Sequence, residues 1–174
     1  MKNIPRLAWA AYGLALVVII LDQLTKLWFL EATGNAQALG LASGVVVVPG
    51  LLKFSFVQNQ GVSFGLFGGG EARWLLSVFS IVVAAGLAWW ATTAKRGLLI
   101  AAIGLVIGGA LGNAIDRVRF GYVVDFLDFS STGLFPWVFN VADSAITVGV
   151  VLLIIDSILS DRKQPPVGVA NEKA

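Results

Sequence analysis

Residues 7–30 read LAWAAYGLALVVIILDQLTKLWFL, an apolar run whose two charges, Asp22 and Lys26, lie near its far end. About 20 mostly apolar residues are enough for a helix to cross a bilayer. The whole chain has the same character: of its 174 residues, 57% are hydrophobic and 13% are charged, and the mean hydropathy is +0.86. Soluble domains usually have about 25% charged residues. The sequence therefore predicts a membrane protein that forms a single domain.

Three further stretches are long and apolar enough to span a membrane, at about 74–93, 98–115 and 139–159. Together with the first stretch they predict an all-α membrane protein, a bundle of four transmembrane helices. The cytoplasmic segments of such proteins are rich in Lys and Arg. Here these residues precede the first span, lie between the second and third, and follow the fourth: Lys2, Arg6, Lys95, Arg96, Arg162, Lys163 and Lys173.

This charge pattern places both termini in the cytoplasm, with a tail at 161–174. The outer loops are then expected at about 31–73 and 116–138. A secretory signal peptide would also begin with basic residues and an apolar run. The run at 7–30 is longer than such a peptide needs, and no convincing small-residue cleavage site follows it. We therefore expect the first span to remain as an uncleaved helix.

The first outer loop has a pattern typical of strands. Val45–Val48 and Leu51–Val57 flank Pro49-Gly50, which predicts two short strands around a turn, a small sheet on the outer membrane surface. Apolar residues among glycines then predict an amphipathic interfacial helix on the same face, although a loop that rests on lipid is the alternative. These residues are Phe64, Leu66 and Phe67.

The chain contains no cysteine and no histidine. Disulfides, thiol nucleophiles, Cys/His metal sites and histidine-based catalytic triads are therefore excluded. A net charge of +2 without a basic run gives no indication of nucleic-acid binding. Proton transfer near neutral pH must then depend on carboxylates, lysine, tyrosine or water.

Polar residues at membrane depth are the most informative ones, because burying a charge costs about 2.5–3.5 kcal/mol on insertion scales. Asp22 and Lys26 are four residues apart and share a helix face, which suits either an internal ion pair or a role in positioning substrate. Asn113 and Arg117 also share a face, and Asp116 lies beside Arg117. The glycines that precede them permit close helix packing.

A second set of polar residues surrounds the last span. Asp125 lies between apolar neighbours, and Asn140 and Asp143 are three residues apart on one helix face. Helix capping alone explains either of the last two residues. It does not explain why both fall at the same outer boundary as Asp125. In the first outer loop, Asn59 and Gly61 suit a turn.

Four aspartates are therefore expected near one depth: Asp22, Asp116, Asp125 and Asp143. Two carboxylates that meet there cannot both ionise cheaply, so they share a proton. One then acts as a base on water, while the other donates a proton to a carbonyl oxygen. The residues alone thus favour a carboxylate pair at the membrane surface, without identifying its substrate.

Five segments, in order along nearly the whole chain, resemble the motifs of the lipoprotein signal peptidases (signal peptidase II). They are Asp22-Gln-Leu-Thr-Lys26, Asn59-x-Gly61-x-x-Phe64, Gly108-Gly109-x-x-Gly112-Asn113-x-x-Asp116-Arg117, Val123-Val124-Asp125-Phe126 and Phe139-Asn140-x-Ala142-Asp143. Each segment alone is common. Their combination in a four-span chain is specific.

The resemblance implies that Asp125 and Asp143 are the catalytic pair of an aspartic endopeptidase. Asp116 would orient Arg117. Polar support around the pair would come from Asn113, Arg117 and Asn140. Three further residues would shape the site and hold the substrate backbone: Asp22, Lys26 and Asn59.

The family cuts prolipoproteins just before a cysteine that carries a diacylglyceryl group, and globomycin blocks its site. The resemblance therefore implies a multi-pass protein of the bacterial inner membrane, active near the periplasmic face, where the outer sheet would be a cradle that clamps the substrate. No cofactor, metal or nucleic acid is expected, and we expect a monomer.

Two other functions remain open from the sequence. A serine–lysine signal peptidase would use Ser63 with Lys53 or Lys26. A small proton-coupled transporter would also place carboxylates in the membrane, although such carriers tend to have inverted repeats and midplane sites, and no repeat is visible here. A purely structural subunit would leave the Asn and Asp spacings unexplained.

Overall fold

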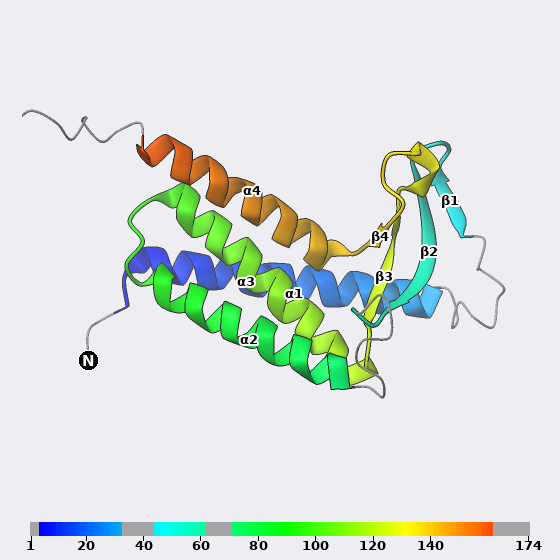
Figure 1. Ribbon diagram of the computed structural model, residues 1–174, viewed down its shortest axis with the longest axis horizontal. Helices are drawn as coiled ribbons and strands as arrows, with labels where there is room; N and C mark the ends of the chain where they lie inside the picture. Colours follow the sequence, from blue (N-terminus) through cyan, green and yellow to red (C-terminus); the bar gives the residue numbers. More distant parts are fainter. Residues whose placement is uncertain (1–3, 33–43, 62–70, 162–174) are drawn as a thin grey trace, which may run out of the picture.

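A computed structural model of the chain describes residues 4–32, 44–61 and 71–161 (Figure 1). Four long helices lie side by side, and a small sheet stands across one end of them. In chain order the elements are α1 (Arg6–Ala32), β1 (Val45–Val48), β2 (Leu52–Asn59), α2 (Glu71–Ala91), α3 (Gly97–Phe120), β3 (Val123–Asp128), the 3₁₀ turn η2 (Ser130–Thr132), β4 (Val138–Phe139) and α4 (Val141–Asp161).

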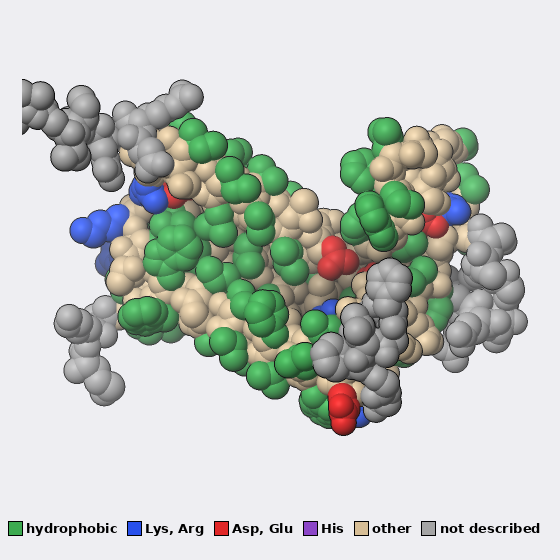
Figure 2. Space-filling model, viewed as in Figure 1, with side chains coloured by type: hydrophobic (Ala, Val, Ile, Leu, Met, Phe, Trp, Pro, Cys, Tyr) green, Lys and Arg blue, Asp and Glu red, His purple; other side chains and the backbone are tan. Residues whose placement is uncertain are grey.

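All four helices are long and apolar enough to cross a membrane, which confirms the predicted spans. Large hydrophobic side chains, among them Phe79 and Trp89, are exposed on their outer faces and suit contact with lipid. Figure 2 shows these side chains over the bundle, while basic side chains gather at the end where α2 connects to α3. Acidic side chains show at the opposite end, near the sheet.

The third helix continues to Phe120, past the predicted end near residue 115. The predicted span ended just before Asp116, which was assigned to the outer loop. In the fold Asp116 is fully buried and paired within the protein, so the helix continues through it. Gly121 then ends the helix with φ of 86°, and its N–H donates to Arg117 O.

Helix α3 is the centre of the bundle, and the other helices pack around it. Small residues allow the close approach: a Cβ added at Gly104 would lie 2.8 Å from Ala11 O, and one at Gly108 would lie 2.6 Å from Val18 Cβ. The glycine-rich face of α3 therefore packs directly on α1, as expected for small residues at membrane helix interfaces.

The sheet has the order β1-β2-β3-β4, and every neighbouring pair is antiparallel. The predicted hairpin around Pro49-Gly50 is confirmed. Strands β3 and β4 are found where the sequence predicted only an outer loop. Residues 123–128 lack strict alternation of apolar and polar residues because β3 is a central strand with both faces largely covered.

An aromatic cluster fixes the sheet to the bundle. Phe29, near the end of α1, stacks on Phe126 of β3 with ring centroids 4.9 Å apart, and it also contacts Phe54 and Phe56 of β2. These contacts hold β3 over the C-terminal part of α1, where Asp22 and Lys26 lie. The predicted interfacial helix around Phe64, Leu66 and Phe67 lies outside the described residues.

Candidate active site

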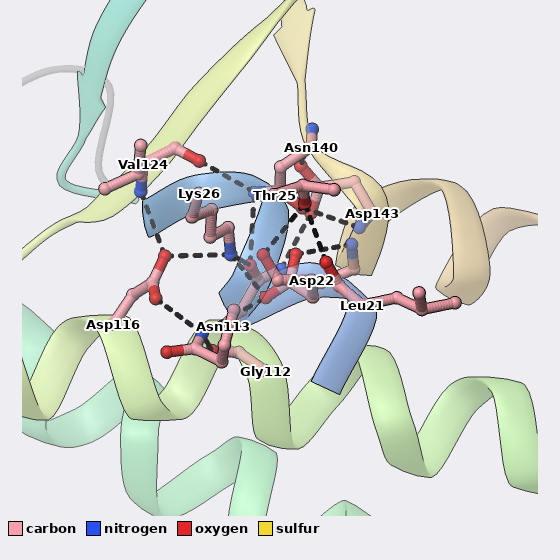
Figure 3. Close-up of polar contacts among 12 residues, drawn as sticks. Leu21, Asp22, Thr25, Lys26, Gly112, Asn113, Asp116, Val124, Asn140 and Asp143 are labelled. Carbon is pink, nitrogen blue, oxygen red and sulfur yellow. Dashed lines mark hydrogen bonds and ion pairs between the residues drawn. The ribbon is translucent and has the colours of Figure 1, made fainter. Parts of the chain in front are cut away.

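The predicted polar residues converge where the C-terminal parts of α1 and α3, strand β3 and the first turn of α4 meet (Figure 3). Segments that are distant in the sequence supply them. Asp22 comes from α1, Asn113 from α3, Asp125 from β3 and Asp143 from α4. The sheet and the bundle therefore build this site together.

Asp125 is 1% exposed, and two asparagines donate to its carboxylate. Asn140 Nδ2 lies 2.7 Å from Asp125 Oδ1, and Asn59 Nδ2 lies 2.9 Å from Oδ2. Asn59 is held in turn by the N–H of Gly61, which donates to its Oδ1 at 2.8 Å. The turn expected at Asn59 and Gly61 thus aims an amide donor at Asp125.

Asp143 lies in the first turn of α4 and receives two N–H donors. Asn113 Nδ2 lies 2.8 Å from its Oδ1, and the backbone N–H of Asn140 lies 3.3 Å from its Oδ2. Asn140 Oδ1 in turn accepts from the N–H of Asp143 at 2.8 Å. This reciprocal arrangement is a helix-capping box, so the capping anticipated from sequence is present. It also couples the backbone of Asp143 to the side chain that contacts Asp125.

Burial, and after it the nearby negative charge of Asp143, raise the pKa of Asp125 to about 7. Hydrogen bonds from Asn59 and Asn140 and the positive charge of Lys26 oppose the rise. A carboxylic acid with such a pKa carries its proton for much of the time at neutral pH. The arrangement can therefore present one protonated and one ionised carboxyl group together.

A buried ionic layer lies under the pair. Lys26, 2% exposed, contacts Asp22 Oδ2 at 2.7 Å, Asp116 Oδ2 at 2.8 Å and Asn113 Oδ1 at 3.2 Å. The predicted Asp22–Lys26 ion pair is thus confirmed, with Asp116 as a second partner. Asp22 Oδ1 also accepts from the N–H of Ala142 at 2.9 Å, which satisfies a free N–H at the start of α4.

Asp116 has partners other than the one expected. Its Oδ2 also accepts from the N–H of Val124 at 3.1 Å, and its Oδ1 accepts from Gln23 Nε2 at 2.8 Å. Within the described residues no hydrogen bond or ion pair joins it to Arg117. Adjacent helix residues point in different directions, which explains the difference. Asp116 therefore ties β3 to the bundle, and its role in orienting Arg117 stays a prediction.

Arg117 lines a cleft of about 700 Å³ beside the carboxylate of Asp125. Asn59, Gly61 and Asp125 line one part of it, and Trp137 lines another. The cleft is therefore bounded by β2, β3, the end of α3 and the segment before β4, and it opens directly onto Asp125. Among the described residues, no group of three or more acidic side chains could hold a metal ion.

Sequence reasoning missed Gln23 in this network and Asp128 in the neighbouring sheet. Gln23 bridges Asp116 and Arg119, because Arg119 NH1 donates to Gln23 Oε1 at 3.1 Å. Asp128, in β3, accepts from Ser55 Oγ at 2.7 Å. Gln23 could have been found as a polar residue next to Asp22 within a membrane span. Asp128 could not, because its partner lies in a strand far away in the chain.

Comparisons with known proteins agree with this architecture. A model of the family described as Signal peptidase (SPase) II matches residues 14–159. A lipoprotein signal peptidase of Caulobacter vibrioides is 49% identical over 164 residues, which cover 93% of this chain and 94% of that protein. One of Pseudomonas putida is 40% identical over 168 residues, which cover 93% of each.

The fold is also similar to a solved structure described as a bacterial membrane enzyme, determined by the in meso method at 2.3 Å resolution. It has a TM-score of 0.72 and 31% sequence identity, over 92% of this chain and 94% of that one. The family model matches nearly every element that builds the site, and the alignments with the two relatives cover 93% of this chain. This chain belongs to the signal peptidase II family.

Proposed function

We propose that this protein is an aspartic endopeptidase that removes the signal peptide from diacylglyceryl-modified prolipoproteins, cutting just before the lipidated cysteine. Its relatives in Caulobacter vibrioides and Pseudomonas putida are lipoprotein signal peptidases, which supports the substrate class. One observation carries the catalytic assignment. Asp125 and Asp143 are bridged by Asn140, and the pKa of Asp125 is raised to about 7.

The chemistry follows the logic of a pair that shares one proton. The raised pKa of Asp125 favours that residue as the carrier of the proton, which leaves Asp143 to act as the base. Asp143 takes a proton from water as the water oxygen bonds to the scissile carbonyl carbon, and Asp125 gives its proton to the carbonyl oxygen. Asp143 then gives the proton it took from water to the amide nitrogen, and Asp125 takes a proton back from a hydroxyl of the intermediate. The C–N bond breaks, and an amine and a carboxylic acid are released.

The cleft position suits a substrate that arrives through the membrane. A signal helix can lie beside the spans with its scissile bond at the end of the bundle, where the cleft opens onto Asp125. Arg96, beside the α2–α3 turn, lies at the opposite end of the bundle and pairs with Asp156 at 2.6 Å. The basic turn marks the cytoplasmic side, so the site faces the periplasm of the bacterial inner membrane.

The serine–lysine alternative has less support. Lys26 is buried between Asp22 and Asp116, where a neutral amine would leave two carboxylates without their cation. Lys53 pairs with Asp128 at 3.3 Å. Ser63 lies outside the described residues. Neither lysine is thus placed as a free base, whereas Asp125 opens onto the cleft.

The test uses purified enzyme in lipid-containing micelles with a synthetic prolipoprotein, in lipidated and unlipidated forms, and mass spectrometry of the products. Asp125→Asn and Asp143→Asn should each lower turnover by on the order of 10³-fold while the protein remains folded. Ser63→Ala should remain active, and globomycin should inhibit the wild type. Normal cleavage by either aspartate variant would refute the pair, and equal cleavage of the unlipidated peptide would refute the substrate class.

A further inference from the structure

The buried ammonium of Lys26 has no hydrogen left for a substrate. It carries three N–H donors and no acceptor. Among the described residues, the three acceptors within reach are Asp22 Oδ2, Asp116 Oδ2 and Asn113 Oδ1, at 2.7, 2.8 and 3.2 Å. With 2% of its side chain exposed, Lys26 lies beneath the cleft and not in it. Apart from its positive charge, which lowers the pKa of Asp125, Lys26 can therefore influence catalysis only through one of these partners.

Asn113 is the partner that reaches the catalytic pair. Its side-chain amide has two different ends: the oxygen accepts, and the nitrogen donates. Lys26 can only donate, so its ammonium selects the orientation in which Oδ1 faces it. That orientation turns Nδ2 toward Asp143 Oδ1, at 2.8 Å (Figure 3). The reversed orientation would set two donors against each other at Lys26 and two acceptors against each other at Asp143.

Asn140 also donates to Asn113 Oδ1, but this hydrogen bond fixes the orientation of the Asn113 amide only in part. Its Nδ2 has two hydrogens, but three acceptors lie within reach: Asp125 Oδ1 at 2.7 Å, Asn113 Oδ1 at 3.2 Å and Val124 O at 3.3 Å. The shortest contact goes to Asp125, so the contact with Asn113 is shared. Lys26, by contrast, has one hydrogen for each of its acceptors.

We propose that Lys26 is a positioning residue that holds the Asn113 amide with its N–H group toward Asp143. This inference rests on the proposed function, because it explains how one member of that pair receives its hydrogen-bond donor. The sequence led us to expect that Lys26 holds the substrate backbone. In this proposal Lys26 does not contact the substrate and acts through Asn113 on Asp143.

The kinetic test is a double-mutant cycle. Lys26→Met and Asn113→Ala should each lower kcat by on the order of 100-fold, as expected for a small misplacement of a catalytic group, and leave KM nearly unchanged. The double variant should be no slower than the slower single variant, because the two act in series. Lys26→Arg, which also only donates, should recover much of the lost turnover.

Additive losses, a rise in KM in place of a fall in kcat, or wild-type turnover in Lys26→Met would overturn the proposal. Lys26→Met leaves two buried carboxylates without their cation and can impair folding. The variant Lys26→Met with Asp116→Asn removes one of these charges. It should show the same loss of kcat with a thermal midpoint near that of the wild type.

A second measurement is independent of activity. Protein labelled with ¹⁵N-asparagine gives side-chain NH₂ signals in micelles, and Asn113→Ala identifies the Asn113 signal by its loss. That signal should shift in Lys26→Met and stay in place in Arg96→Gln, which breaks the ion pair at the other end of the bundle. An unmoved signal in Lys26→Met would refute the orienting role. Failure of the wild type to cleave lipidated substrate would refute the proposed function, while this measurement would still decide the role of Lys26.

Discussion

The side chain of Asn140 lies 2.7 Å from the carboxylate of Asp125, and the same asparagine caps the helix that carries Asp143. One buried residue thus joins β3 of the sheet to α4 of the bundle. The distance between the two carboxylates depends on this joint, since their backbones belong to different layers of the fold. The side chain of Asn140 has two separable functions. Its amide N–H donates to Asp125, and its oxygen caps α4.

Substitutions of Asn140 should separate these two functions. Serine is a good N-cap residue but has no amide, so Asn140→Ser should lose most turnover and keep most stability. Asn140→Ala should lose turnover equally and should also lower stability by about 1 kcal/mol through the missing cap. Cleavage rates and thermal midpoints in micelles measure both effects. Near-normal cleavage by Asn140→Ser would show that Asp125 does not need this donor.

The pH–rate profile should have an alkaline limb near pH 7, where Asp125 loses its proton. The Asn59 N–H lowers the pKa of Asp125, because it favours the charged carboxylate. Asn59→Ser should therefore raise that pKa and move the alkaline limb to higher pH. Initial rates of cleavage between pH 5 and 9 give the midpoints. A limb that stays in place or moves down would contradict the assignment of the proton to Asp125.

Two aspartates of β3 should have opposite effects on stability. The folded pKa of Asp125 is raised from 3.8 to about 7, so the folded state binds this proton more tightly than the unfolded state. The stability that binding of this proton contributes is present below pH 3.8 and is lost as the pH rises to about 7 and above. Asp125→Asn removes the buried charge. It should raise the thermal midpoint at pH 8, at about 2–4 °C per kcal/mol, and change it little at pH 4.

Asp128 should behave in the reverse way. Burial alone would raise its pKa, but hydrogen bonds from Ser130 and Ser55, together with Lys53, lower it to about 2. This stability is present above pH 4 and is lost as the pH falls toward 2. Asp128→Asn should cost about 1.5–3 kcal/mol at pH 7, as for hydrogen bonds to a charged group. The same midpoint for Asp128→Asn and wild type at neutral pH would contradict this account.

The sequence predicted the bundle because length and apolar content alone decide whether a helix can span a bilayer. It also predicted the pairing of Asp22 with Lys26, since both residues lie one helical turn apart. Strand β3 was not predicted, because covering on both faces removes the alternation that marks a strand. The partners of Asp116 were not predicted either, because Lys26, Gln23 and Val124 belong to elements that only the fold brings together.

Assignment of the catalytic pair from the sequence depended on resemblance more than on pattern. Asp125 and Asp143 are 18 positions apart by their numbers in a segment that contains two strands and a 3₁₀ turn. No helical or strand spacing relates them. Their approach depends on the pairing of β3 with β4, in which Leu127 lies opposite Phe139, because this pairing brings the chain back just before Asn140.

The contact between α3 and α4 offers the last prediction, because it sets the position of Asp143 relative to Asn113. A Cβ added at Gly109 would clash with Ala142 O and would lie 2.6 Å from Ile146 Cγ1. Gly109→Ala should therefore push the first turn of α4 away from α3 and lower kcat by on the order of 100-fold, as expected for a displacement of about 1 Å. Gly86→Ala is the matched control in α2, since a Cβ there meets nothing within 4 Å. Alanine also favours a helix over glycine, so this control should keep full turnover and at least wild-type stability. Equal kcat for both variants would show that the helix contact leaves the position of Asp143 unaffected.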